Sequence, residues 1–300
     1  MAMIEDRTWG SVLFNVVNHA FLVVMGVVWL YPMARVIALS LSDPTMILLG
    51  EVNWYPKRPT LKGYTYILSY RLLWRAYANT VLYAGVGTFV TITLTSMIAY
   101  SLSIKTFVLR KFLTVYLAIT MFFSGGLIPT FLLIKTLGGM DTFWVMVIPG
   151  SVAAFTVIVF RTFFQNHPES LRESAYIDGA NDFTILFRIV LPMSTALLAT
   201  FALFTIVSHW NRWFEALIYL TDPERHPLQM ILRRLVVMED TLHHLFDAQD
   251  PRILAMMEGV IHPKNIQFAA VVVVLVPIVI MFPYAQRYFM KGLIVGSLKG

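Results

Sequence analysis

Carboxylate side chains gather in one short stretch of the sequence, ESAYIDGAND, at residues 173–182. Glu173, Asp178 and Asp182 lie here around a glycine, with long uncharged runs on both sides. Such side chains form hydrogen bonds and ion pairs. Their burial in lipid is energetically costly, so they are rare there and mark functional positions. The stretch therefore marks a segment that leaves the apolar surroundings of its neighbours.

Histidines suggest a second kind of chemistry, metal binding, in the polar loop 211–265. His243 and His244 lie there with His262, but two adjacent histidines have no convincing ligand spacing. The chain has no cysteine, so a disulfide or a cysteine-ligated metal centre is excluded. No metal site is predicted.

No segment of the chain is expected to supply energy or catalysis. The phosphate-binding pattern G-x-x-x-x-G-K-[ST] is absent, because GVGTFVT at residues 85–91 lacks the lysine. The long apolar runs contain no Asp, Glu, Lys or Arg, and His19, which lies well inside one, is expected to be a packed or interfacial residue. We predict no catalytic residue and no cofactor in this chain, and an energy source in another subunit.

Composition places these residues in a membrane protein, since 58% are hydrophobic and only 13% are charged. A spanning helix needs about 20 apolar residues. Six runs reach this length: residues 11–34, 76–104, 112–134, 142–160, 189–210 and 266–286. We expect an all-α membrane protein with one transmembrane domain over residues 1–300, whose first run is a retained span rather than a signal peptide. The basic residues that give the chain its net charge of +6 are expected to face lipid headgroups and not nucleic acid.

Basic residues beside the spans predict the orientation of the chain. An even number of spans puts both termini on one side of the membrane. The short loop between the second and third runs holds Lys105, Arg110 and Lys111 without an acid, and the C-terminal tail is also basic. Because positive charge concentrates in cytoplasmic loops, we predict cytoplasmic termini, although the long loops 36–75 and 211–265 also carry many Lys and Arg.

Two short helices are expected to position the carboxylates, in a loop of residues 163–192. Pro168 suits a first helical turn, and Gly179 offers the left-handed conformation that ends a helix. Asn181 or Asp182 can cap a second helix, which Pro192 closes at the start of the fifth span. We predict a helix–turn–helix in the membrane plane; an interfacial amphipathic hairpin without a special role is the alternative.

This loop resembles the signature EAA…DGA…F..I.LP of permease subunits of bacterial ABC importers. The matching residues are Glu173, Ala175, Asp178, Gly179, Ala180, Phe187, Ile189, Leu191 and Pro192. Ser174 is a departure, where the family usually has its first alanine. The resemblance implies a type I ABC importer fold in the bacterial inner membrane, with six transmembrane helices and a cytoplasmic coupling helix.

In that family the coupling helix docks into a cleft on a cytosolic ATPase subunit. By resemblance, Glu173 and Asp178 would hold the loop and its docking by charge and hydrogen bonds, while Ala175 and Gly179 would permit close approach. The predicted coupling site also includes Ser174, Ala180, Phe187 and Pro192. The resemblance further implies a second permease subunit, two ATP-binding cassette subunits that hold ATP and Mg, and an external solute-binding protein.

Other stretches narrow the resemblance to carbohydrate uptake. Residues 209–229, beginning HWNRWFEA, are similar to permeases related to the smaller maltose-importer subunit, and residues 287–300 are similar to their closing tail. FFSGGLIPTFLLIK, at residues 122–135, is similar to a subgroup that serves complex oligosaccharides, including alginate and pectin-derived sugars. We therefore expect a complex or acidic oligosaccharide as substrate.

The pathway for this substrate is expected near the end of the fifth span. Trp210, Asn211, Arg212 and Trp213 could form a sugar platform, because aromatic faces stack on sugar rings and Asn and Arg reach hydroxyls or carboxylates. An interfacial aromatic belt is the other interpretation. The loop 211–265 would contact the binding protein, and its basic residues suit a uronate, although acidic residues in the same loop mix its charge.

The C-terminal tail is predicted to be a flexible, basic strand. Its residues of interest are Lys291, Gly292, Gly296 and Lys299. The resemblance implies that this strand docks at the ATPase dimer interface, and a tail that binds headgroups is the alternative. For the whole chain, the alternatives to an importer permease are an ion-coupled secondary sugar carrier and a non-transporting membrane scaffold.

Overall fold

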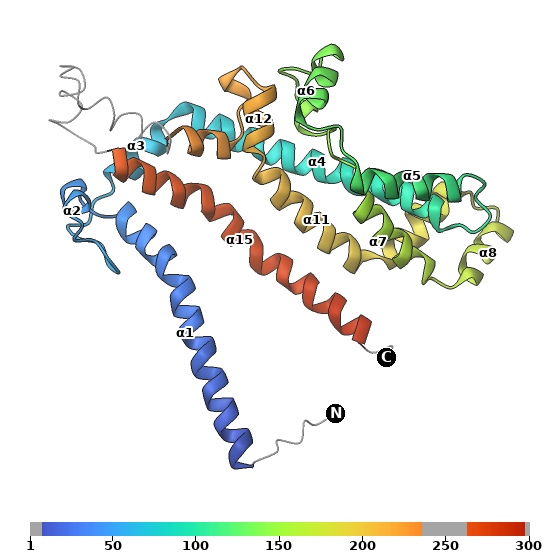
Figure 1. Ribbon diagram of the computed structural model, residues 1–300, viewed down its shortest axis with the longest axis horizontal. Coiled ribbons are helices and arrows are strands. Elements are labelled where there is room, and N and C mark those ends of the chain that lie inside the picture. Colours follow the sequence, from blue (N-terminus) through green and yellow to red (C-terminus); the bar gives the residue numbers. More distant parts are fainter. Residues whose placement is uncertain (1–7, 236–262, 298–300) are drawn as a thin grey trace. The chain divides into compact units, whose positions relative to one another are not determined.

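The computed structural model describes residues 8–235 and 263–297, and every regular element in these ranges is a helix (Figure 1). The chain forms two compact units. The first contains the described parts of Met1–Tyr70 and Leu235–Leu275, and the second those of Arg71–Arg234 and Val276–Gly300. The last helix, α15 (Pro263–Ser297), contributes residues to both units.

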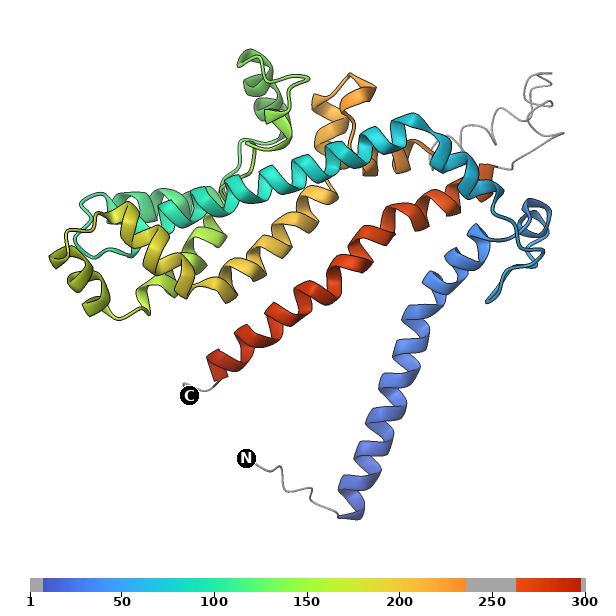
Figure 2. The ribbon, with the colours of Figure 1, turned by 180° about the vertical axis from the view of Figure 1, so that it is seen from behind.

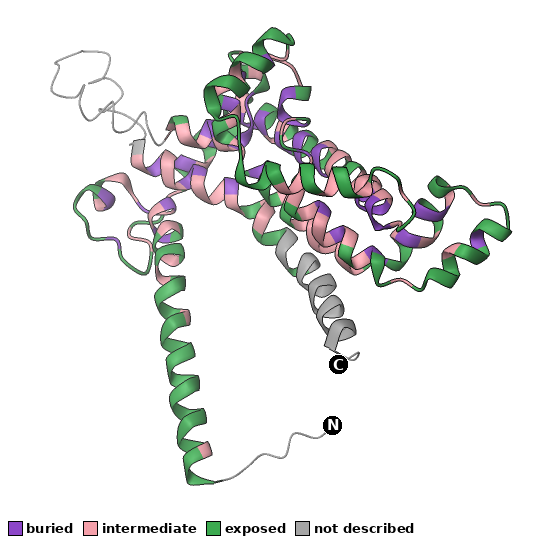
Figure 3. Ribbon diagram, turned by 45° about the vertical axis from the view of Figure 1, so that its right-hand side comes forward, coloured by how far each residue is buried: buried purple, intermediate pink, exposed green. Residues whose placement is uncertain are grey.

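The first unit begins with α1 (Trp9–Ser40), a long apolar helix that buries almost none of its side chains (Figure 3). Trp29, for example, is 77% exposed. A single helix that is apolar on all sides is suited to contact lipid. Within the described residues, α1 is therefore the element whose surface most requires a membrane or another subunit.

Short elements complete the first unit after α1, namely α2 (Pro44–Leu48) and α3 (Lys62–Ser69). Asn265 donates a hydrogen bond from Nδ2 to the carbonyl oxygen of Ser42, at 2.8 Å. Gly63 leaves room for this asparagine, because a Cβ at Gly63 would lie 2.1 Å from its Oδ1. A polar contact thus joins the start of α15 to the segment after α1.

The second unit is built along α4 (Arg71–Ser103), which packs against α7 (Ala154–Gln165) and α11 (Thr195–Trp210). The other elements are α5 (Arg110–Phe122), α6 (Leu127–Thr136), η1 (Trp144–Met146), α8 (Glu169–Ile177), α9 (Asp182–Ile185), η2 (Leu186–Val190), α10 (Leu191–Met193), α12 (Trp213–Tyr219) and η3 (Pro223–Arg225). Residues 228–235 are helical as well. Figures 1 and 2 show α8 near one end of this unit and α12 far from it along α4.

Close contact between α4 and α11 depends on Gly87. A Cβ at this position would lie 2.4 Å from ring atoms of His209, which is buried. A hydrophobic cluster lies on each side of this crossing. The cluster near α8 contains Ala99, Tyr100, Leu102, Val157, Phe160, Phe164, Ala175, Ile185, Leu186 and Val190. The other contains Tyr83, Ile134, Val145, Met146, Val147, Ala216, Tyr219, Leu220 and Met230.

Three of the predicted spans are not single straight helices. In the run 112–134, α5 and α6 are separated by residues 123–126 and bent by 118°, with Gly126 in the left-handed region at φ +80°. In the run 189–210, the segment Asp182–Met193 and α11 meet at an angle of 86°. The run 142–160 contains η1, an irregular stretch with Gly150 at φ +74°, and only the start of α7. Apolar content predicted these runs, but glycine and proline interrupt their helices.

The three remaining runs lie inside long helices: 11–34 in α1, 76–104 almost wholly in α4, and 266–286 in α15. Among the described residues, two helices are long and apolar enough to cross a membrane, α1 and α4. The number rises to four if each bent pair counts as one span.

Candidate functional site

The predicted helix–turn–helix is present, and its first helix is α8. Pro168 occupies the N-cap, one position before the first turn in which it was expected, and Asp178 is the C-cap. Gly179 has φ +80°, as its position predicted. The N–H of Gly179 donates to the carbonyl of Tyr176, and the N–H of Ala180 donates to that of Ala175. These two bonds form a Schellman motif, which ends the helix sharply and requires glycine at the turn.

The second helix begins at α9, with Asn181 as its cap. The Oδ1 atom of Asn181 accepts hydrogen bonds from the N–H and the hydroxyl of Thr184, both at 2.9 Å. The helix continues as a π-helical segment, η2, and then as α10. Ser194 ends it, donating from Oγ to the carbonyl of Val190 at 2.7 Å. Phe187 is exposed on the π-helical segment and Pro192 lies in α10.

The carboxylate that fastens this loop is that of Asp182. Its Oδ1 accepts hydrogen bonds from the hydroxyls of Tyr176, at 2.6 Å, and Tyr100, at 3.1 Å. It therefore joins α8, α9 and α4. Glu173 and Asp178, which were expected to hold the loop and its docking, are both exposed and have no hydrogen bond or ion pair in the described part of the chain, so they do not fasten the loop to it; their role in docking stays a prediction.

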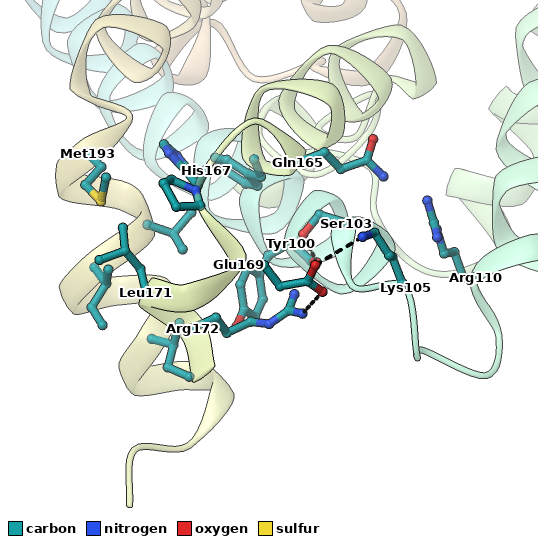
Figure 4. Close-up of a pocket in the computed structure, with 15 residues that line it drawn as sticks. Tyr100, Ser103, Lys105, Arg110, Gln165, His167, Glu169, Leu171, Arg172 and Met193 are labelled. Atoms are coloured by element: carbon teal, nitrogen blue, oxygen red, sulfur yellow. Dashed lines mark hydrogen bonds and ion pairs between the residues drawn. The ribbon is translucent and has the colours of Figure 1, made fainter. Parts of the chain in front are cut away.

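A second fastening uses Glu169, the first residue of α8. Its carboxylate forms ion pairs with Lys105 and Arg172, each at 3.1 Å (Figure 4). The hydrogen-bonded ammonium of Lys105 holds the pKa of the Glu169 carboxyl below its usual range, and Arg172 adds to the effect. Exposed pairs of this kind stabilise weakly, but this one joins α8 to the segment after α4.

The tip of the loop is apolar as well as acidic. Ile177 is 87% exposed and Phe183 is 62% exposed, on either side of Gly179. Sequence reasoning did not single out these two residues, although a bulky apolar side chain beside a predicted turn was a visible signal. Ala175 of α8, by contrast, is buried, as close packing of this helix requires. Ser174 is exposed and donates to the carbonyl of Leu171.

The predicted sugar residues at the end of α11 are not brought together on one surface. Trp210 is buried, and the side chain of Arg212 is 13% exposed. Arg212 donates to the carbonyl of Met146 at 3.0 Å and lies 3.9 Å from Glu215, so it ties α11 to η1. A platform or belt of all four residues is wrong, because two of them face the interior.

The other two residues of this group remain accessible. Asn211 is exposed and accepts a hydrogen bond from Gln229 at 3.1 Å. Trp213 is partly exposed, and the guanidinium of Arg233 lies 4.5 Å from its ring centroid. The accessible polar surface at this end therefore includes Gln229 and Arg233, which the sequence pattern did not indicate.

A network of hydrogen bonds, also not foreseen, fixes the start of the loop 211–265. Asp141 accepts hydrogen bonds from the N–H groups of Thr221, at 2.6 Å, and Asp222, at 3.0 Å, and from the Thr221 hydroxyl. These bonds lower the pKa of the Asp141 carboxyl, with the Thr221 hydroxyl contributing most. Glu224 forms ion pairs with Arg71 at 2.8 Å and Arg75 at 3.5 Å.

The tail and the loop histidines are only partly described. Lys291, Gly292 and Gly296 lie in α15, so their backbone is helical rather than the flexible strand that was expected. Lys299, His243, His244 and His262 lie outside the described residues. In residues 8–235 and 263–297, no group of three metal-binding side chains comes together.

These features define an integral-membrane transport subunit: apolar helices, and a polar helix–turn–helix with an exposed tip. The chain belongs to the family of binding-protein-dependent transport system inner membrane components, whose pattern covers residues 10–295. It is therefore an inner-membrane permease subunit of an ABC transporter and not an enzyme. The family predicted from the signature in residues 163–192 is confirmed.

Individual relatives cover nearly the whole chain. It is 36% identical over 289 residues to the polygalacturonan/rhamnogalacturonan transport system permease protein YtcP of Bacillus subtilis (strain 168), covering 96% of this chain and 99% of that protein. It is 35% identical over 287 residues to protein LplC of the same organism, covering 96% and 95%.

Among solved structures, the chain is similar to a subunit in the crystal structure of a bacterial ABC transporter involved in the import of the acidic polysaccharide alginate. The TM-score is 0.85 and the identity 29%, over 94% of this chain and 98% of that one. The all-helical type I importer fold expected from the sequence is confirmed by this match.

Proposed function

We propose that this chain imports a complex, acidic oligosaccharide and that the α8 loop receives the movement of an ATPase subunit. The observation that carries the coupling role is the contrast within the loop itself. Its base is held by Asp182 and by buried Ala175, whereas its tip presents exposed Ile177 beside the carboxylates of Glu173 and Asp178, which have no ion pair within residues 8–235 and 263–297. A rigid base with an apolar and charged tip suits a contact that must transmit force.

The proposed assembly places this permease beside a second permease subunit, two ATP-binding cassette subunits and an extracytoplasmic solute-binding protein. The family description, binding-protein-dependent transport, supports the last of these. ATP and Mg belong to the cassette subunits. Closure of these subunits would move α8 and shift the spans between inward- and outward-facing states, and a preference of about 5.5 kcal/mol is enough for a nearly complete shift.

The substrate class rests on the relatives and on one feature of this chain. One relative is a polygalacturonan/rhamnogalacturonan transport system permease, and the similar crystal structure is that of a transporter involved in the import of alginate. In this chain, the guanidinium of Arg233 lies over the ring of Trp213, and the exposed Asn211 precedes Trp213 by two residues. An aromatic face with a guanidinium suits a sugar ring that carries a carboxylate.

The α8 end is proposed to face the cytoplasm, together with both termini. Lys105, Arg110 and Lys111 lie at this end in a segment, residues 105–111, that contains no acidic residue, and Lys105 pairs with Glu169 of α8. Because the chain has no cysteine, single cysteines at Val108 and Leu137 can be labelled without background. In sealed, right-side-out vesicles, an impermeant maleimide should label Leu137→Cys and spare Val108→Cys. The reverse pattern would contradict the orientation.

The coupling role is tested by a charge at the tip of α8. Ile177→Glu should weaken association with the ATPase subunits about tenfold, because it removes an apolar contact at the proposed centre of the interface. Val108→Glu, which changes a 93%-exposed apolar residue at the same end, serves as the matched control. Both variants are measured by pull-down and by binding-protein-stimulated ATP hydrolysis. Equal retention by the two variants would refute the coupling role.

Reconstitution in proteoliposomes tests transport itself. The assembled complex with its binding protein should take up labelled oligogalacturonate or oligo-alginate only when ATP is supplied on the side of the membrane where the ATPase subunits lie. Uptake without ATP would indicate an ion-coupled carrier, and no uptake of acidic or neutral oligosaccharides would favour a scaffold. Preference for neutral oligosaccharides would keep the importer and reject the acidic substrate.

A further inference from the structure

A cavity of about 450 Å³ lies beside the base of α8, at the place where α8 meets the segments after α4 and α7 (Figure 4). Its polar lining includes Lys105, Arg110, His167, Glu169 and Arg172. The volume is within the range of small-ligand pockets. The coupling function described above uses the exposed tip of the loop and assigns no role to this space.

The charge of the lining is unbalanced. Lys105, Arg110 and Arg172 are cations, and Glu169 is the one carboxylate among the residues that line the cavity, which gives a formal charge of +2. Lys105 and Arg172 already share Glu169. Arg110 lies beyond Lys105 in Figure 4 and has no ion pair with a carboxylate in the described part of the chain.

A further cation intensifies this positive field. Arg161 of α7 is close enough to Arg110 for the two guanidinium groups to repel each other. Arg161 donates from one terminal nitrogen to the hydroxyl of Thr114 at 3.2 Å, and its Nε has no partner among the described residues. Several cations around one cavity are stabilised when an anion enters it.

The kind of anion follows from the donors. Guanidinium groups bind the oxygens of phosphate in pairs, and an ammonium adds a point charge. Arg110 and Arg172 with Lys105 therefore suit a tetrahedral phosphate better than a single chloride. We propose that this cavity binds a phosphate group, carried either by a lipid headgroup or by a small soluble phosphate.

The surroundings favour the lipid as the source. Arg110 is the first residue of α5, and the following turns expose Phe112, Val115, Tyr116 and Ile119. A lipid with its phosphate at Arg110 would have its acyl chains along this apolar surface. Basic pockets at the cytoplasmic ends of spans are suited to anionic headgroups. A bound phosphate would also contact Lys105 and Arg172, which hold Glu169, so its presence would affect the base of α8.

The test uses the full-length chain assembled with its partner subunits in nanodiscs, with phosphatidylglycerol or phosphatidylcholine as the lipid. Native mass spectrometry counts retained lipid, and titration with inorganic phosphate forms a separate arm. Arg110→Gln should lower phosphatidylglycerol affinity about tenfold, since a hydrogen bond to a charged group is lost. Lys111→Gln, an exposed neighbour that does not line the cavity, is the matched control. Arg110→Lys should restore part of the affinity.

Each outcome decides the proposal. Loss of phosphatidylglycerol in Arg110→Gln but not in Lys111→Gln supports a lipid phosphate. Arg110-dependent binding of inorganic phosphate, without preference between the lipids, supports a soluble phosphate. Equal losses in both glutamine variants mean diffuse surface charge and overturn the site, as does the absence of both retained phosphatidylglycerol and phosphate binding in the assembled complex. The assay measures no transport, so it can fail while the proposed function stands.

Discussion

At one end of α4, Tyr100 donates a hydrogen bond to the side chain of Asp182; towards the other, Tyr83 donates one to the backbone carbonyl of Arg225. The same helix thus holds two loops in different ways. Near Tyr83, Asn79 also donates to the backbone carbonyls of Glu224 and His226, at 2.7 and 3.2 Å. The hydroxyl of Thr80 accepts from the N–H of Leu228 at 2.8 Å.

Side chains that bind backbone atoms fix the path of a chain, whereas bonds between side chains can change partners while the path moves. The loop at the α12 end is held mainly by bonds of the first kind, from α4 and from Asp141, with ion pairs of Glu224 to Arg71 and Arg75 in addition. The α8 loop is held by Asp182 and Glu169, both on its own helices, and turns at Gly179. The comparison indicates a fixed loop at one end and a hinged contact surface at the other.

The largest effect is expected at the contact between α4 and α11, on which both loops depend. Gly87→Leu would place its Cβ 2.4 Å from the ring of His209, so α11 must shift from α4. Overpacking of this kind costs about 1–3 kcal/mol, which should lower the apparent Tm of the purified protein. Gly85→Leu, whose Cβ would meet nothing within 4 Å, should leave the Tm nearly unchanged. Equal Tm values for the two variants would show that the α4–α11 contact is not tight.

Asp141→Ala should loosen the fixed loop and leave the hinged one intact. It removes three hydrogen bonds to Thr221 and Asp222, with an expected loss of about 2 kcal/mol. Hydrogen exchange should accelerate at residues 220–231 but not at 169–193. Faster exchange at both ends would break the comparison.

The same carboxylate gives a pH dependence whose sign follows from its lowered pKa. The folded chain binds a proton at Asp141 less readily than the unfolded chain, so this stabilisation is present above about pH 3.9, the unfolded value, and is lost as pH falls through the folded pKa. Asp141→Asn should show no such loss from this position, and Asn suits the left-handed backbone at φ 53°.

How well the sequence predicts these sites depends on how far apart the contacting residues lie along the chain. Pro168, Gly179 and Asn181 were predicted because helix ends are governed by local rules. The fastening by Asp182 was not, since it requires Tyr100, 82 residues away in the chain. Local rules place a carboxylate on a turn, but they do not say which tyrosine meets it.

The group at residues 210–213 shows the opposite error. Four residues that are adjacent in sequence were interpreted as one surface, but α11 ends at Trp210 and α12 begins at Trp213, so the chain turns between them and the four side chains do not share one face. Trp210 and Arg212 accordingly face the interior, while Asn211 and Trp213 remain accessible. The partners that complete the accessible surface, Gln229 and Arg233, come from a later segment whose path only the fold determines.

The smallest effect is expected at the hinged loop, where Tyr100→Phe removes one of the two hydrogen bonds to Asp182. The loss should be about 1 kcal/mol, because Tyr176 still satisfies the carboxylate. A double-mutant cycle with Asp182→Asn should give a coupling energy of similar size for the Tyr100–Asp182 pair. If this hydrogen bond carries force to the spans, Tyr100→Phe should reduce binding-protein-stimulated ATP hydrolysis more than it reduces Tm. Tyr83→Phe, which loses a bond to the backbone of the fixed loop, should lower Tm by a comparable amount with less effect on ATP hydrolysis.

Equal effects of the two variants on ATP hydrolysis would mean that both loops transmit the movement, and the distinction between a fixed and a hinged end would be lost.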